Sequence, residues 1–333
     1  MTTICVDAMS SDGGPEVVLQ GIAQALEEDS NLSVLVAGSS EYVTPFCERH
    51  EGALPLISSE VIHMDEHPAT AVRKKKDASI VRAARAVREG KAEGLFSAGS
   101  TGAVLTASTF IIGRIRGIKR PAIALPIPGP NGKRTIFLDM GANADVRPDM
   151  LVQFAQMGRA YSRIVTGTQN PTVGLLSNGS EDTKGSQLAL EYHKALAEAD
   201  CNFKGNAEGT DLLSGSFDVV VTDGFTGNVA LKSVEGTAKF IVGALKDSIE
   251  GSPRLALGAL MLKPALKKVA SELSGDKYGG AILIGLKAPV LKGHGASSVD
   301  AVTAGTLHCA EIVRAHLVDE VSKTIQAHEA QDQ

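Results

Sequence analysis

A short apolar run that ends in small, hydroxyl-bearing residues constrains this chain more than any other feature. Residues 95–103 read Leu-Phe-Ser-Ala-Gly-Ser-Thr-Gly-Ala, and a helix-like pattern follows them. Such a strand–turn–helix segment is typical of phosphate sites, because glycines let the backbone approach an anion and hydroxyl and helical N–H groups donate to it. The segment predicts an α/β protein that holds a phosphate group without a nucleotide motif.

Apolar runs alternate with helical patterns along all 333 residues. We expect strands at residues 3–7, 33–37, 60–63, 94–96, 122–125, 135–139, 172–176, 202–204 and 217–222. We expect helices between them, among others at residues 15–28, 79–89, 101–114, 148–166 and 185–199. This order predicts βαβ units and therefore a three-layer α/β/α fold with a mostly parallel sheet. We expect one domain over residues 1–330, with a short tail at 331–333.

Polar, glycine-rich turns follow five of the expected strands. They lie at residues 7–14, 97–102, 139–143, 177–185 and 222–228. One such turn reflects backbone chemistry or helix capping alone, since these residue types are favoured there. Ligands of parallel sheets bind beyond the carboxyl ends of the strands. Five turns at one edge therefore predict a polar crevice that binds an anion.

Composition and missing motifs exclude several classes of function. A net charge of −5 and the lack of tryptophan disfavour a nucleic-acid-binding protein. The chain contains no dinucleotide fingerprint, no P-loop and no HExxH motif, and Pro68 makes a metal-binding helix around His63 and His67 doubtful. The cysteines are scattered without a CxxC pair, and the first residues do not resemble a signal peptide. We expect a cytoplasmic protein that uses no metal and no organic cofactor.

Seven segments between residues 3 and 315 carry a resemblance to a known family. They are residues 6–9, 97–103, 113–115, 120–122, 139–143, 221–228 and 278–280, of which Asp-Gly-Phe-Thr-Gly-Asn at 223–228 is the most specific. Together they closely resemble the PlsX-type phosphate acyltransferases of bacteria. Two departures affect turn geometry: Ser10 and Ser11 stand where the family usually has glycines, and Ser177-Asn178 replaces its usual pair.

The resemblance implies both a fold and a reaction. The fold is expected to be similar to that of phosphotransacetylases and isopropylmalate dehydrogenases. The reaction is expected to transfer a fatty acyl group from acyl-acyl-carrier-protein to inorganic phosphate, giving acyl phosphate for phospholipid synthesis. Members of this family are homodimers that associate peripherally with the membrane, where a glycerol-phosphate acyltransferase uses the product.

The chemistry of such a transfer needs anion donors more than a strong base. Phosphate is itself a nucleophile, so the protein must hold it beside a thioester carbonyl and stabilise the resulting oxyanion. We expect Lys184 to neutralise charge and Asn228 to donate to a carbonyl or phosphate oxygen. The other expected substrate-binding residues are Ser97, Ser100, Thr101, Gly102, Asn143 and Asp223. The alternatives are a solvated loop lysine at 184 and an N-cap at 228 for a helix over residues 229–245.

A basic cluster stands out in this acidic chain and fits an acidic carrier protein. The expected docking residues are Arg73, Lys74, Lys75, Lys76, Arg82 and Arg85. Arg82 and Arg85 share one helix face together with Arg88. A solvated helix face is the alternative explanation.

An apolar run at residues 255–262 precedes Lys263 and Pro264. Its eight residues are too few to span a bilayer, which needs roughly 20. We expect a protruding helical segment at about 250–273 whose Leu257, Leu260 and Met261 contact either the membrane surface or the partner of a dimer.

Three other functions fit parts of the same pattern. A phosphotransacetylase would use acyl-coenzyme A as donor, and a nicotinamide-dependent dehydrogenase would show hydride transfer. A non-catalytic scaffold would bind phosphate and lipid without turnover.

Overall fold

The computed structural model of the protein describes residues 1–249, 261–262, 264 and 279–331. All eleven strands of this described part form one sheet, in the order β3-β2-β1-β4-β11-β10-β5-β6-β9-β7-β8. The strands are β1 (Thr2–Asp7), β2 (Leu32–Gly38), β3 (Ala53–Ile57), β4 (Gly94–Ser97), β5 (Ala122–Pro128), β6 (Arg134–Leu138), β7 (Val173–Leu176), β8 (Phe203–Ala207), β9 (Val219–Val221), β10 (Ala281–Ile284) and β11 (Val290–Lys292).

Helices cover both faces of the sheet, which confirms the predicted three-layer fold. One apolar core packs α1 (Gly14–Glu28), α2 (Ser40–Cys47), α6 (Pro148–Thr166), α7 (Gln187–Glu198), α10 (Val299–Arg314) and α11 (Leu317–Gln331) against one face. A second core packs α3 (Pro68–Lys74), α4 (Ser79–Arg88), α5 (Thr101–Ala107) and part of α8 (Gly224–Ile249) against the other. Strand β1 shows why: Ile4 and Val6 enter the first core, and Cys5 enters the second.

Most neighbouring strands pair parallel, as predicted, but β10 runs antiparallel to both of its neighbours, and the direction reverses for the whole group of strands that follows β5 in the sheet. Strands β1 to β4, β5 and β11 run one way. Strand β6 pairs antiparallel with β5, and β9, β7 and β8 follow the direction of β6. The reversal comes from the β5–β6 hairpin, whose turn residues Asn131 and Gly132 have φ angles of 57° and 76°.

One predicted strand is absent from the structure, and three strands of the structure were not predicted. Residues 60–63 form no strand, and Glu60 makes only an isolated bridge to Ala78. The free edge of β2 is instead taken by β3, which contains Pro55. An edge strand tolerates proline because its outer N–H groups have no partner to lose. Strands β10 and β11 were not among the predicted strands.

Two helices are shorter than their apolar patterns predict, and one begins earlier. The helix expected at 101–114 ends at Ala107 and continues as a π-helical turn over Ser108–Ile112, which stops at Gly113 with a φ of 89°. The helix expected at 185–199 begins after its N-cap Ser186. Helix α8 begins at Gly224, so Asn228 lies inside it, and the prediction of a helix that starts at 229 is wrong.

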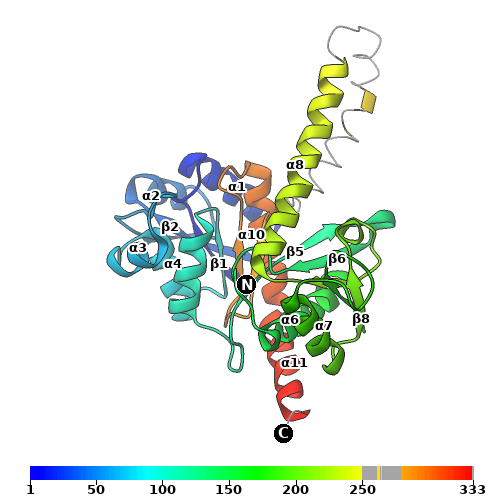
Figure 1. Ribbon diagram of the computed structural model, residues 1–333. Helices are drawn as coiled ribbons and strands as arrows, with labels where there is room; N and C mark the ends of the chain where they lie inside the picture. The colour runs from blue at the N-terminus through cyan, green and yellow to red at the C-terminus, as the bar shows by residue number, and fades with distance from the viewer. Residues whose placement is uncertain (250–260, 263, 265–278, 332–333) are drawn as a thin grey trace.

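Helix α8 extends away from the sheet and its covering helices (Figure 1). Its exposed apolar side chains include Phe240, Ile241, Val242 and Leu245. The predicted contact residues Leu257 and Leu260 lie outside the described residues, as does most of the segment 250–273. Met261 is described and is 80% exposed. Among the described helices, none has both the length and the apolar character that crossing a bilayer requires.

Candidate active site

The five polar turns do not meet at one edge of the sheet in the simple way that the sequence predicts. Because the strand direction reverses at the β5–β6 hairpin, the turns after β1 and β4 lie at the carboxyl edge of one strand group. The turns after β6, β7 and β9 lie at the carboxyl edge of the other group. The candidate site therefore consists of two clusters of residues, and α8 connects them.

The first cluster is built around a buried serine. The side chain of Ser97 is fully buried, and its hydroxyl donates to the Asp7 carboxylate at 2.8 Å. The same oxygen accepts the N–H of Gly99 at 3.1 Å. Gly99 in turn lies against Ser10, one of the serines that replace glycine. The Ser97 hydroxyl is thus engaged inside the protein, where it fixes the turn that leads into α5.

Ser100 caps the following helix. Its hydroxyl accepts the N–H of Ala103 at 3.2 Å. The N–H groups of Thr101 and Gly102 have no backbone acceptor in the described part of the chain. A Cβ on Gly102 would overlap the ring of Pro68, so this position requires glycine. The structure thus places Ser97, Ser100, Thr101 and Gly102 in one turn.

Lys292 joins this cluster and was missed by the sequence analysis. It is the last residue of β11, where its Cα pairs with that of Ser97. Burial lowers the pKa of Lys292, the nearby charge of Lys232 lowers it further, and Asp12 opposes the shift. Among described residues, its ammonium group has no hydrogen-bond or ion-pair partner. The sequence carries the same signal here as at the other polar turns: a short apolar run, Val290–Leu291, is followed by the polar, glycine-rich segment Lys-Gly-His-Gly.

The second cluster is organised by the fully buried Asp139. One carboxylate oxygen accepts the N–H groups of Ile123, Gly141 and Ala142 at 2.9, 3.3 and 3.0 Å. The other accepts the backbone and side-chain N–H groups of Asn143, both at 2.8 Å. Burial raises the pKa of Asp139 against the effect of these hydrogen bonds. The Asn143 amide also donates to the Pro121 carbonyl at 2.8 Å, so its donors serve the turn itself.

Asp223 and Asn228 take different places at the start of α8. The Asp223 carboxylate accepts the N–H and hydroxyl of Thr226 at 2.8 and 2.7 Å, which is the chemistry of an N-cap. The side chain of Asn228 is exposed and lies over Gly141 of the second cluster. Its amide therefore remains available to a ligand, whereas the Asp223 carboxylate is engaged.

Lys184 lies on the exposed loop after β7. Its backbone N–H donates to the Glu181 carbonyl at 3.0 Å, and its aliphatic stem covers Gly179. Within the described chain, its ammonium group makes no hydrogen bond or ion pair. Among the described residues, no hydrogen bond or ion pair joins Lys184 to the other predicted site residues, although β7 lies beside β9 in the sheet.

Helix α8 connects the two clusters. It starts directly after β9, where Gly224 donates to the Asn143 carbonyl at 2.7 Å. Two turns later, the charge of Lys232 acts on Lys292 of the first cluster. Lys232 is itself paired with Glu235 at 2.7 Å, whereas Lys292 has no ion-pair partner among the residues that the structure describes.

The basic cluster at residues 73–88 is only partly available to a partner. Lys75 is engaged by the Val61 carbonyl at 2.8 Å and by Glu66 at 2.7 Å. Arg82 pairs with Asp77 at 3.1 Å. Arg85 donates to the carbonyl of Lys76 at 3.1 Å. Of the predicted docking side chains, Arg73, Lys74 and Lys76 are exposed.

The cysteine thiols belong to the core or its border. Burial raises the pKa of the Cys5 and Cys309 thiols well above the ordinary value, and it raises that of Cys201 to about 11. Thiols with raised pKa values are poor nucleophiles at neutral pH. The described residues contain no group of three or more potential metal ligands.

Comparison with known proteins covers nearly the whole chain. Residues 2–319 match the family model described as "Fatty acid synthesis protein". A phosphate acyltransferase of Lacticaseibacillus casei is 44% identical over 327 residues, which are 98% of this chain and 96% of that protein. A phosphate acyltransferase of Limosilactobacillus fermentum is 48% identical over 295 residues, or 87% of this chain and 86% of that protein.

Solved structures share the fold at low sequence identity. A phosphotransacetylase from Streptococcus pyogenes superposes with a TM-score of 0.60 at 17% identity, covering 94% of each chain. A branched-chain phosphotransacylase from Enterococcus faecalis gives a TM-score of 0.55 at 15% identity, covering 95% of this chain and all of that one. These likenesses confirm the expected phosphotransacetylase-like fold.

Proposed function

The chain belongs to the fatty acid synthesis protein family, and from this membership we propose that it transfers a fatty acyl group from an acyl carrier protein to inorganic phosphate. Its relatives over nearly the full length are named phosphate acyltransferases. The products are an acyl phosphate and the free thiol of the carrier. The protein is an acyltransferase in which phosphate is the nucleophile.

The observation that carries the proposal is the ammonium group of Lys292, which has no hydrogen-bond or ion-pair partner in the described part of the chain. It lies at the carboxyl end of β11 beside the turn that contains Ser100, Thr101 and Gly102. A partly buried cation without a protein partner is stabilised when an anion binds to it. Burial and the charge of Lys232 lower the pKa of Lys292, which means that its charged form is destabilised in the free protein. A bound anion beside the ammonium group would offset this destabilisation.

The arrangement supports a direct attack of phosphate on the thioester. A phosphate oxygen forms a bond to the acyl carbonyl carbon, the carbon–sulfur bond breaks, and the thiolate takes a proton. Lys292 and the N–H groups of Thr101 and Gly102 hold the phosphate. Asn228 donates to the carbonyl oxygen as negative charge develops on it, and Lys184 offsets the charge of the incoming anion.

The remaining predicted residues act on the shape of the site. Ser97 fixes the first turn through Asp7, and Asn143 fixes the second through Asp139. Asp223 sets the start of α8 and thereby the position of Asn228. Each is a positioning residue, because its polar atoms bond to the protein.

We further propose a cytoplasmic homodimer that contacts the membrane at its periphery. The exposed apolar side chains on the projecting part of α8, such as Phe240 and Ile241, support such a contact. Phe240→Asp is expected to lower either dimerisation in analytical ultracentrifugation or flotation with anionic phospholipid vesicles. Loss of dimers would indicate that these apolar side chains of α8 contact the partner chain. Loss of flotation with dimers retained would indicate that they contact lipid.

Donor identity is tested by supplying long-chain acyl-carrier protein or acyl-coenzyme A, each with and without phosphate. Thiol release and acyl phosphate are measured together. We expect phosphate-dependent release that is much faster with the carrier protein. Faster release from acyl-coenzyme A would favour a phosphotransacetylase, and folded protein that binds phosphate without release would favour a scaffold.

The two lysines are tested with a matched surface substitution. We expect Lys292→Met to raise the KM for phosphate at least about tenfold, since one charge-assisted contact to the anion is lost. Lys184→Ala is expected to reduce kcat strongly in a folded protein. Lys287→Met removes an exposed lysine outside the site and serves as control. Near-normal kinetics in either site variant would remove that lysine from the mechanism.

A further inference from the structure

A second cationic surface lies apart from the cluster at residues 73–88. A groove of about 400 Å³ opens between the π-helical turn after α5 and the start of α6. Its lining includes Phe110, Arg114, Lys119, Arg120 and Arg147. The segments 113–115 and 120–122 stood out in the sequence, but the proposed reaction gives them no role.

The groove carries more positive charge than the protein neutralises. Arg147 pairs with Asp149 at 3.2 Å through two nitrogens, and Lys119 pairs with the same carboxylate. Arg114 donates only to the backbone carbonyl of Lys119. Arg120 has no hydrogen-bond or ion-pair partner among the described residues. Four cationic side chains thus share one carboxylate, and an anionic partner is favoured here.

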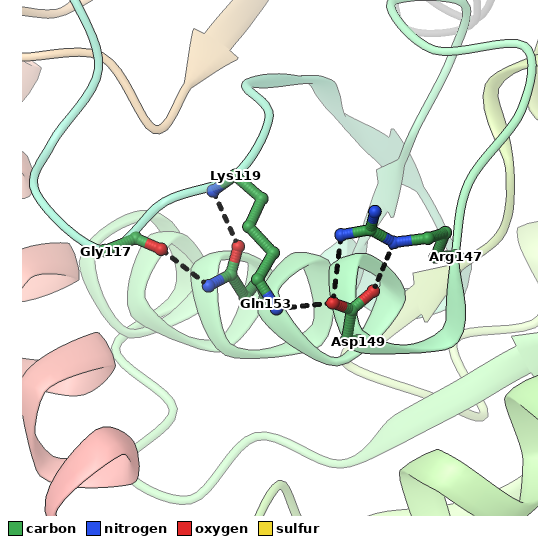
Figure 2. A network of polar contacts seen from close by, with 5 residues as sticks. All are labelled: Gly117, Lys119, Arg147, Asp149 and Gln153. Carbon is green, nitrogen blue, oxygen red and sulfur yellow. Dashed lines mark hydrogen bonds and ion pairs between the residues drawn. The ribbon is translucent and has the colours of Figure 1, made fainter.

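The loop that holds these cations is fixed to α6. The side-chain amide of Gln153 donates to the Gly117 carbonyl and accepts the Lys119 N–H, both at 2.9 Å. Figure 2 shows this amide between the loop and the helix, beside the pairs that Asp149 makes. Gln153 is buried, so the two hydrogen bonds are shielded from water. The backbone of the loop that carries these cations is therefore fixed before a partner arrives, which lowers the entropy cost of binding.

An apolar anchor lies among the charges. The side chain of Phe110 is 77% exposed, and it lines the groove together with the half-buried Met150. An exposed aromatic side chain surrounded by arginines is the composition typical of protein-binding hot spots. A free phosphate ion would use the charges alone, so Phe110 favours a protein partner with apolar residues on an acidic face.

The groove borders the candidate active site. Pro121, which lines it, accepts the hydrogen bond from Asn143. Two residues later, the N–H of Ile123 donates to Asp139. A partner seated in the groove therefore lies next to the second cluster of the site.

We propose that this groove docks the acidic acyl carrier protein, with Phe110 contacting its apolar residues and Arg114 and Arg120 contacting its carboxylates and the phosphodiester of its thioester arm. The inference rests on the proposed function and assigns docking to residues other than the 73–88 cluster. In that cluster, Lys75 and Arg82 form ion pairs within the protein and are less available to a partner.

Charge reversal tests the groove against both alternatives. The variants are Arg114→Glu with Arg120→Glu, and Phe110→Ala. Arg116→Glu changes an exposed arginine of the same loop that does not line the groove, and Arg73→Glu with Lys74→Glu changes the other cluster. For each, kcat/KM is measured with acyl-carrier protein and with the carrier-free thioester acyl-pantetheine. Binding of fluorescently labelled holo-carrier protein is measured in parallel by anisotropy.

In the Arg114→Glu/Arg120→Glu variant, we expect kcat/KM with acyl-carrier protein, divided by kcat/KM with acyl-pantetheine, to fall about tenfold or more. The affinity for holo-carrier protein should fall by a similar factor, and it should depend less on salt concentration than in the wild type. Phe110→Ala is expected to lower both severalfold, and both control sets to leave them near wild type. The inference would be overturned if the ratio and the affinity fell only in the Arg73→Glu/Lys74→Glu variant. It would also be overturned if Arg116→Glu lowered them as much as the double groove variant does. If the wild type forms no acyl phosphate, the proposed function fails, and the anisotropy measurement still decides whether the groove binds the carrier.

Discussion

Replacing Asp139 by asparagine tests the architecture of the second cluster with an almost isosteric change. The carboxylate is fully buried and accepts five N–H groups. In Asp139→Asn, the orientation that loses least keeps the side-chain oxygen where it faces Ile123, Gly141 and Ala142. The new amide nitrogen then faces both donors of Asn143, and two hydrogen bonds become donor–donor contacts.

The expected cost follows from these contacts. Each charge-assisted hydrogen bond contributes about 1.5–3 kcal/mol, so the gross loss is roughly 3–6 kcal/mol. Burial raises the pKa of Asp139, which means that a neutral side chain recovers part of the desolvation cost. We therefore expect a net loss of about 2–4 kcal/mol. For a chain of this length, that corresponds to a melting temperature lower by about 3–6 °C.

Differential scanning calorimetry measures the effect, with Asp145→Asn as the matched control. Asp145 is an exposed carboxylate of the same loop. We expect the control to melt within about 1 °C of the wild type. We expect Asp139→Asn also to lower kcat, because it disturbs the loop beneath Asn228, the proposed donor to the acyl carbonyl oxygen. A melting temperature for Asp139→Asn equal to that of the control would refute the role assigned to this carboxylate.

Gly227→Ala is expected to destabilise the protein by more than about 3 kcal/mol in denaturant unfolding, because its new methyl group would overlap the carbonyl oxygen of Asp139. Gly236→Ala, on the exposed side of the same helix, meets no atom within 4 Å and should stabilise it by about 0.5–1 kcal/mol; equal effects of the two changes would contradict the close packing of α8. The hydrogen bond from Arg147, together with Lys119, lowers the pKa of Asp149 to about 2. Its ion pairs therefore stabilise the fold above about pH 4, and this stabilisation is lost as the pH falls toward 2. The loss is less than about 1 kcal/mol, because the paired side chains are about half exposed. Thermal unfolding of Asp149→Asn should depend less on pH in that window, and an unchanged dependence would contradict the pairing.

The layers of the fold were predictable because their signals are local. Strands such as β1 and β4 combine an apolar run with a polar, glycine-rich end, and helix α6 carries an apolar face over nineteen residues. The sequence also contains a signal for the reversal of strand direction. Asn131-Gly132 between two apolar runs is a strong hairpin signal. The expectation that all five turns share one edge treats every strand as parallel, which this hairpin contradicts.

The candidate site was less predictable because its residues depend on non-local partners. The turn at residues 97–103 leads from a strand into a helix, as the sequence predicts, but Ser97 faces Asp7, which is ninety residues away in the sequence. Lys292 ends a strand of three residues, which is too short for periodicity to reveal. Asp223 could have been identified as a cap from its spacing to Thr226.

The most direct test of the account supplies the protein with long-chain acyl-carrier protein and phosphate labelled with oxygen-18, and analyses the products by mass spectrometry. Direct attack by phosphate predicts acyl phosphate that contains all of the labelled phosphate oxygens, formed in step with the free carrier thiol. Release of unlabelled fatty acid, or thiol release that does not depend on phosphate, would contradict it.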